Sequence, residues 1–312
     1  MRQGNILKKH RFGSPKKWRL SLVCYAMLAT PIIGFFVFNL YPILWAAHKS
    51  LFFYNNVASD TRYVGLENFI RLFTEDTTYW STWLTTFKFA LLKLPMELPL
   101  AMILAVMLHK KLKCTGFFRS VYFMPSIISV AIIGLIFSNM FDYFGFINGV
   151  LMKFGLIEKE IEWLANTNTA MLVLAIGSTW NSFGVNVLYF IAALNNVDED
   201  LYESAYLDGA SSWTIFWKIT LPLIAPVLQV VLLLSLNGTL HTNDYILVTT
   251  NGAPGGSTYT VMSYVTGKFV PGFAGAGVNV GYGTSVALVT SAIMAFIALI
   301  YTKLSNKMNN LY

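Results

Sequence analysis

The stretch ESAYLDGASSWTIFWKITLPLIAP, residues 203–226, begins with acidic and small residues, passes through a glycine into aromatic residues, and ends in an apolar run with two prolines. Asp198, just upstream, has the chemistry of a helix N-cap, and the two acidic residues after it suit the helix dipole. Gly209 is a natural end for that helix. Pro222 can begin the next helix, where a missing N–H does no harm. The stretch therefore predicts a short helix, an aromatic segment and a long apolar helix.

The composition is that of an integral membrane protein. Of the 312 residues, 55% are hydrophobic and 12% are charged, which is about half the charged share of an ordinary soluble domain. The net charge of +7 comes from residues beside the apolar runs, so no separate nucleic-acid-binding domain is predicted. The two cysteines and four histidines are scattered along the chain, which predicts neither a disulfide nor a metal centre.

Six apolar runs are long enough to cross a bilayer, for which a helix needs about 20 residues. The second and fifth runs contain prolines or polar residues, so both are predicted to be kinked helices beside a wet path. The fold class is therefore predicted to be all-α, with about six transmembrane helices. The predicted spans are residues 23–47, 84–108, 121–140, 170–194, 223–245 and 284–302.

The positions of Lys and Arg predict the orientation, because cytoplasmic loops are enriched in them. Fourteen lie on the side of the two termini and six on the opposite side, so both termini are predicted to be cytoplasmic. The chain then divides into a basic arm, residues 1–19, a transmembrane domain, residues 20–303, and a C-terminal tail, residues 304–312. The loop 195–222, between the fourth and fifth spans, is predicted to be cytoplasmic although it is acidic.

The same loop resembles the signature of a transporter family. Its residues follow the E-A-A-x-x-x-G-x9-I-x-L-P pattern of bacterial ATP-binding-cassette (ABC) importer permeases, with serine in place of the first alanine, a small-for-small change. TWNSFGVNVLYFIAALNNVDEDLYESAYLDGASSW, TTNGAPGGSTYTVMSYV and GLENFIRLF are similar to segments of the carbohydrate-uptake branch, of the maltose and glycerol-phosphate permease type. In this family the loop is a coupling helix that docks on a cytoplasmic ATPase. The residues expected to take part in docking are Glu203, Ser204, Ala205, Asp208, Gly209, Ile219, Leu221 and Pro222.

The resemblance implies a type I ABC importer permease fold in the cytoplasmic membrane of a bacterium. It also implies a second homologous permease, two cytoplasmic ATPase subunits, and an extracellular or periplasmic solute-binding protein as partners. The expected function is import of a mono- or oligosaccharide through a pathway of which this chain forms half.

The chain is predicted not to be an enzyme. A Walker A loop needs G-x-x-x-x-G-K-[ST], and the Gly-Lys pair at Gly267 and Lys268 is followed by Phe269 and has no glycine at the required offset. ATP and magnesium are therefore expected on the partner ATPases, with no cofactor or metal held by this chain.

Polar residues on the predicted spans are candidates for the substrate path, since sugars are recognised by polar side chains beside aromatic rings. Three of them on the fifth span fall at i, i+4 and i+7, on one face of a helix. The same residues could instead form interhelical hydrogen bonds, worth about 0.6 kcal/mol each, and the sequence leaves both roles open. The candidates on the fourth and fifth spans are Asn181, Asn186, Tyr189, Asn237, His241 and Asp244.

Lys93 and Glu97, on the second span, stand four residues apart, so they can pair on one helix face. Glu97 is expected near mid-membrane, and a charged pair at that depth is a candidate functional site. The alternative is a structural role at a kink formed by Pro95 and Pro99.

Two other functions stay open at this stage. The same architecture could import a polyol, glycerol phosphate or a sugar acid, although an anionic solute would call for a cation in the path, for which Lys88 and Lys93 are the candidates. A secondary transporter driven by an ion gradient would need coupling-ion ligands or an internal inverted repeat, and the two halves show no convincing repeat.

Overall fold

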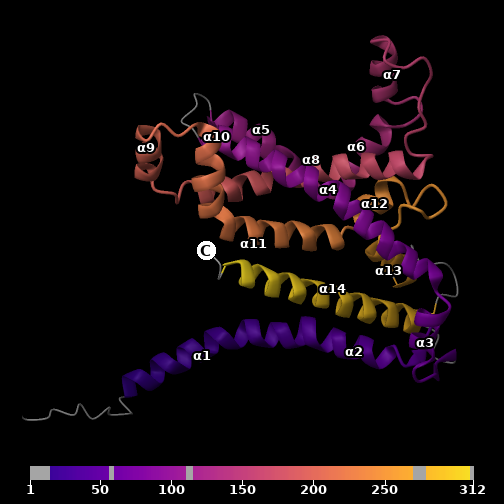
Figure 1. Ribbon diagram of the computed structural model, residues 1–312. Helices are drawn as coiled ribbons and strands as arrows, with labels where there is room; N and C mark the ends of the chain where they lie inside the picture. Colours follow the sequence, from indigo (N-terminus) through magenta and orange to yellow (C-terminus); the bar gives the residue numbers. More distant parts are fainter. Residues whose placement is uncertain (1–14, 56–59, 110–114, 270–278, 310–312) are drawn as a thin grey trace, which may run out of the picture.

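The computed structural model describes residues 15–55, 60–109, 115–269 and 279–309 (Figure 1). The first part of the predicted basic arm, the basic segment 110–114 and the last three residues of the tail lie outside the described residues. The described part is helical apart from loops and one two-stranded ladder, β1 (Phe52–Phe53) with β2 (Arg62–Tyr63). The all-α prediction is therefore confirmed.

Five helices in the described ranges are long and apolar enough to cross a membrane, and a bent pair makes six if it counts as one span. The spans are built from α1 (Pro15–Phe35), η1 (Phe36–Leu40) and α2 (Tyr41–Lys49); α4 (Thr77–His109); α5 (Thr115–Ile127) and α6 (Val130–Met140); α8 (Thr167–Leu194); α10 (Ser212–Ile215), η3 (Phe216–Thr220) and α11 (Leu221–Leu240); and α14 (Val280–Asn309). The shorter helices are α3 (Glu67–Thr74), α7 (Phe146–Lys153), α9 (Glu199–Leu207), α12 (Asp244–Thr249) and α13 (Val261–Phe269).

The long helices α1 with α2, α4, α8, α11 and α14 run broadly between the same two ends of the molecule, and the short helices lie toward these ends (Figure 1). The start of α1, the helix α9 and the C-terminal end of α14 lie at one end, and α3, α7 and α13 lie at the other. One core cluster joins α4, α8 and α11 around Ala101, Phe190 and Val231. Gly184 lets α5 approach α8 closely, because a Cβ there would meet the backbone of Tyr122, and small residues allow such contacts between membrane helices.

Two spans contain a π-helical turn immediately before a proline. The N–H of Tyr41 donates to the carbonyl of Phe36, five residues back, and Pro42 follows. The N–H of Leu221 donates to Phe216 in the same way, before Pro222. Proline has no N–H to donate to the carbonyl four residues back, and its ring clashes with that carbonyl. The wider π turn makes room for the ring.

The fifth span therefore begins earlier than predicted. Helical structure runs without a gap from Ser212 to Leu240, because α10 and the π turn η3 precede α11. Pro222 lies in the first turn of α11, as predicted, and the π turn before it removes the clash with the preceding helix.

The third span is not the continuous helix predicted for residues 121–140. α5 and α6 meet at 94°, and Ser129 between them has an extended ψ of 135°. The side chain of Asn181, on α8, donates to the carbonyl of Pro125 at 2.8 Å, and Ser126 Oγ donates to the carbonyl of Asn181 at 2.7 Å. The first bond gives a partner to a carbonyl in the last turn of α5, beside the break, and the second ties that turn to α8. Such partners are the condition for a broken helix at membrane depth.

The fifth span ends at Leu240, earlier than predicted, and α12 begins at Asp244. The break is stabilised by Thr260, whose hydroxyl donates to the carbonyl of Thr242 at 2.8 Å. Asn237, on α11, and Asp244, on α12, therefore do not share one helix, and the prediction of a single polar face at i, i+4 and i+7 is wrong.

Candidate functional site

The helix α9 has the ends that the sequence predicts. The side chain of Asp198 accepts a hydrogen bond from the N–H of Asp200 at 3.2 Å and so caps the first turn. At the other end Gly209 has a φ of 78°, a conformation that glycine adopts without strain. The N–H of Gly209 donates to Tyr206 at 3.1 Å and that of Ala210 to Ala205 at 3.0 Å, which closes the helix as in a Schellman motif.

The surface of α9 is mostly exposed. Figure 1 shows the helix standing out from the spans at one end of the molecule. Within α9 only Ala205 is buried, whereas Glu203 and Ser204 are exposed and Leu207 is 89% exposed. Leu201 and Tyr206 are exposed as well, so α9 presents several large hydrophobic side chains, which makes it a candidate for contact with another protein.

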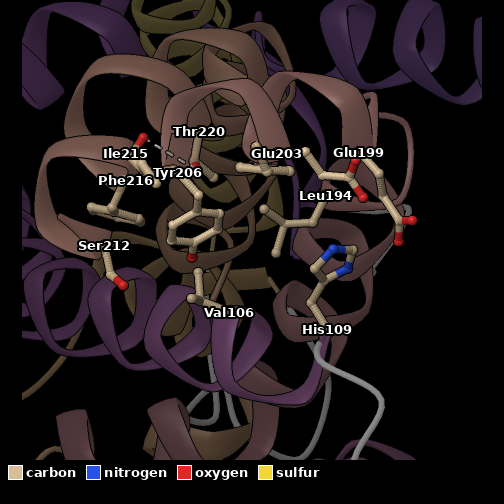
Figure 2. A pocket seen from close by; sticks show the side chains of 11 residues that line it. Val106, His109, Leu194, Glu199, Glu203, Tyr206, Ser212, Ile215, Phe216 and Thr220 are labelled. Carbon is tan, nitrogen blue, oxygen red and sulfur yellow. Dashed lines mark hydrogen bonds between the residues drawn. The ribbon is translucent and has the colours of Figure 1, made fainter. Parts of the chain in front are cut away.

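A cavity of about 320 Å³ separates α9 from the ends of the spans. Figure 2 shows the ring of Tyr206 in this cavity, with Glu199, Glu203 and His109 at one side of it. The His109 ring is held by Asn195, with Nδ1 3.1 Å from Oδ1. The cavity thus has an apolar floor and an acidic edge. Its lining residues are Val106, His109, Leu194, Glu199, Tyr202, Glu203, Tyr206, Ser212, Ile215, Phe216 and Thr220.

The second half of the signature leads from α9 into the fifth span. Ile219 lies in the π turn η3, and Leu221 and Pro222 are the first residues of α11. These residues set the backbone geometry of the fifth span, and none of the three is buried.

Lys93 and Glu97 form the predicted pair inside the bundle. Lys93 Nζ lies 3.3 Å from Glu97 Oε2 and donates to Thr239 Oγ1 at 3.2 Å. Asn186 Nδ2 donates to Glu97 Oε1 at 2.8 Å and to Ser235 Oγ at 3.0 Å. All five residues are buried, so the bonds join α4, α8 and α11 and place Asn186 and Glu97 in a polar network of the subunit interior.

A second cavity, of about 520 Å³, lies where α11 gives way to α12. It brings together four predicted residues from separate elements: Lys93, Asn181, His241 and Asp244. The side chains of Asn186, Tyr189 and Asn237 are not among its lining residues, and the last two are exposed elsewhere on the surface. The lining is completed by residues that were not predicted from the sequence: Val130, Ser178, Ser182, Gly238, Thr242, Asn243, Tyr245 and Met262.

Two polar atoms at this cavity are buried without a hydrogen-bond partner, Asn243 Oδ1 and the Tyr245 hydroxyl. An unsatisfied buried group costs free energy unless water or a ligand satisfies it. The donor and acceptor types present, amide, imidazole, carboxylate and hydroxyl, suit a polar, hydroxylated molecule.

α12 reaches α8 at Gly177, where an added Cβ would clash with the Tyr245 hydroxyl and lie 2.8 Å from Phe137. We expect Gly177→Ala to lower the free energy of unfolding by about 1–3 kcal/mol, as other overpacked cores do. Tyr245→Phe alone should have a small effect, because its hydroxyl has no partner, and it should recover part of the loss in the double variant. Thermal unfolding of the purified variants measures both, and equal losses for Gly177→Ala with and without Tyr245→Phe would contradict the assigned contact.

A second polar cluster fixes the opposite end of the spans. The hydroxyls of Tyr264, at 2.5 Å, and of Tyr282 donate to Asp76 Oδ2, and the N–H of Tyr79 donates to Oδ1 at 3.0 Å. Burial alone would raise the pKa of Asp76, but these hydrogen bonds and the nearby Lys268 lower it below its ordinary value. The ionised Asp76 therefore ties the start of α4 to α13 and α14.

Comparison with known proteins assigns the chain to a transporter family. Residues 97–310 match the family model described as binding-protein-dependent transport system inner membrane component, and the chain belongs to this family of multi-pass membrane permeases. It is 33% identical to the lactose transport system permease protein LacF of Rhizobium radiobacter, over 84% of this chain and 87% of that protein. It is 32% identical to the arabinooligosaccharides transport system permease protein AraP of Bacillus subtilis, over 90% of this chain and 88% of that protein.

A solved structure has the same fold. A chain of a bacterial ABC transporter involved in the import of the acidic polysaccharide alginate superposes with a TM-score of 0.81, covering 94% of this chain and 98% of that chain at 21% identity. The family and the all-α importer permease fold predicted from the sequence are confirmed.

Proposed function

We propose that this chain is a membrane-spanning subunit of an ATP-driven importer of a mono- or oligosaccharide. A second homologous permease would complete the pathway, two cytoplasmic ATPases that bind ATP and magnesium would drive it, and a solute-binding protein would deliver the sugar from outside. The observation that carries the proposal is the signature loop, which folds as the exposed, capped helix α9 and leads directly into a span. The lactose and arabinooligosaccharide permeases among the relatives support the substrate class.

The proposed mechanism is alternating access, with α9 as the contact to the ATPase. The segment Ser212–Leu240 starts beside α9 and ends at the cavity lined by His241 and Asp244, called the solute cavity. It bends where α10 gives way to α11 (Figure 1), and α11 has 20 residues, about 30 Å at 1.5 Å per residue. ATP-driven movement of α9 would therefore be carried through this bent helix to the solute cavity. In this orientation α9 and both termini are cytoplasmic.

The charges around the solute cavity favour a neutral solute over an anionic one. Lys93 is the one basic residue besides His241 among the described lining residues, and its ammonium group is already paired with Glu97. Lys88 is exposed and does not line the cavity. A sugar therefore fits the lining better than glycerol phosphate or a sugar acid.

The solute cavity predicts which substitutions weaken uptake. Asp244→Ala removes a charged hydrogen-bond acceptor, a loss of about 1.5–3 kcal/mol, or roughly 10- to 100-fold in transport at low sugar concentration. ATPase activity without solute should be unchanged. Asn237→Ala is the matched control, because this exposed side chain does not line the cavity. Equal losses in the two variants would argue against the cavity as the solute site.

The proposed function is tested by reconstituting the membrane complex with its co-encoded partners and measuring ATP hydrolysis. A panel of mono- and oligosaccharides is supplied through the binding protein. Stimulation by one sugar-loaded binding protein is the expected result. If no ATPase co-purifies and uptake follows an ion gradient, the chain is a secondary transporter and the proposal is wrong.

A further inference from the structure

We infer that α3 lies in the outer boundary of the bilayer, with Leu66, Ile70 and Phe73 inserted among the lipid chains. These three residues are called the apolar flank. The inference concerns an interaction surface and its lipid partner, and it does not depend on which solute the protein carries.

The apolar flank is one contiguous strip along α3. At 100° per residue, its three residues fall within about 60° of each other around the helix axis. Their side chains are large and exposed: Leu66 is 63% exposed, Ile70 60% and Phe73 56%. An exposed apolar strip of this kind on a short helix calls for a partner other than water.

The opposite side of α3 is fixed in the protein, so the helix cannot turn its apolar flank inward. Leu72 is fully buried and Asn68 is 4% exposed. The side chain of Asn68 donates to the carbonyls of Ser50, at 2.8 Å, and Phe52, at 3.1 Å. These bonds anchor α3 to the end of the first span.

The remaining side of α3 is polar and exposed. Arg71 and Glu75 have side chains that are 58% and 71% exposed, with Arg71 Nε 3.9 Å from Glu75 Oε2, and the Arg71 guanidinium lies over the Tyr282 ring at 4.9 Å. α3 therefore has three sectors, one toward the protein, one suited to water and one apolar. This arrangement is typical of a helix lying in the plane of a membrane interface.

The position of α3 identifies lipid as the partner of its apolar flank. α4, a membrane span, begins at Thr77, three residues after α3 ends. The Phe73 and Trp80 rings are in contact, with centroids 5.6 Å apart, and exposed Leu84 and Leu91 continue the apolar strip along α4. Tryptophan is enriched where spans meet the headgroups, so the flank joins the apolar face of a span at the depth of the boundary.

The test places a fluorescent probe on α3 in lipid nanodiscs. In a background with Cys24→Ser and Cys114→Ser, Ile70→Cys is labelled with an environment-sensitive dye, and Glu75→Cys on the water sector is the matched control. We expect the probe at residue 70 to show a blue-shifted emission that is quenched by nitroxide lipids and spared by aqueous iodide. The probe at residue 75 should show the opposite pattern.

Two further measurements separate lipid from a protein partner. Leu66→Cys should repeat the result at residue 70, which guards against a local effect of one label. Labelled complexes are then measured with and without the solute-binding protein. Quenching by iodide at residue 70 would overturn the inference, and so would protection from both quenchers, because that result would show a protein covering the flank.

Discussion

Glu203→Lys is expected to reduce solute-dependent ATP hydrolysis and uptake to background while leaving the protein in the membrane. Glu203 is exposed on α9 and lies at the acidic edge of the adjoining cavity. Lysine reverses the charge of the surface proposed to bind the ATPase without removing an internal contact. Because surface substitutions change the free energy of unfolding by about 0.5 kcal/mol or less, membrane abundance should stay normal, as an immunoblot of the membrane fraction would show.

Two neighbouring substitutions serve as controls for this result. Ser204→Ala replaces an exposed small residue with the alanine of the E-A-A pattern that the loop resembles, and it should keep full activity. Gly209→Asp should lose solute-dependent ATP hydrolysis and uptake, as Glu203→Lys does. A side chain is strained at a φ of 78°, so the turn after α9 would shift. Coupled ATP hydrolysis that survives in Glu203→Lys would refute the docking role.

Local chemistry explains why the boundaries of α9 could be predicted. A capping side chain and a glycine determine helix ends within a few residues, and both Asp198 and Gly209 take those roles. The number of spans could also be predicted, because the length of an uncharged apolar run is a property of the sequence alone.

The breaks in the spans could not be predicted, because they depend on partners far away in the sequence. The run 121–140 is equally apolar whether the helix is straight or bent, and the bend is stabilised by Asn181 on another helix. The end of α11 similarly involves Thr260, which donates to the Thr242 carbonyl. Helical periodicity, applied across that break, wrongly grouped Asn237 with Asp244.

Part of the lining of the cavity proposed to hold the solute consists of residues predicted from the sequence. Asn181, His241 and Asp244 were proposed because they are polar residues on predicted spans, and the fold brings all three to one cavity. The serines were missed because a lone serine in an apolar helix is unremarkable, yet Ser178 and Ser182 stand three before and one after Asn181. Ser178 therefore shares a helix face with Asn181, at i and i+3, and with Ser182, at i and i+4, and this spacing was the available signal.

The largest expected change in stability concerns Lys93 and Glu97. Glu97→Leu would leave the Lys93 ammonium group buried with Thr239 as its remaining polar contact. Removing one member of a buried ion pair costs about 3–5 kcal/mol, so we expect the single variant to unfold at a much lower temperature and to be depleted from the membrane. Lys93→Met combined with Glu97→Leu removes both charges, and replacement of a buried pair by apolar residues is often neutral.

Transport by these variants separates the structural role of the pair from a role in the pathway. If the pair only joins α4, α8 and α11, the double variant should regain both thermal stability and uptake. Glu97→Gln gives the complementary test, because it keeps an oxygen for Asn186 Nδ2 but removes the charge. Full transport and normal abundance in Glu97→Gln would exclude a pathway role for its charge. Normal stability with lost transport would instead assign the charge to the transport cycle, since Lys93 also lines the solute cavity and would then face it without its counter-ion.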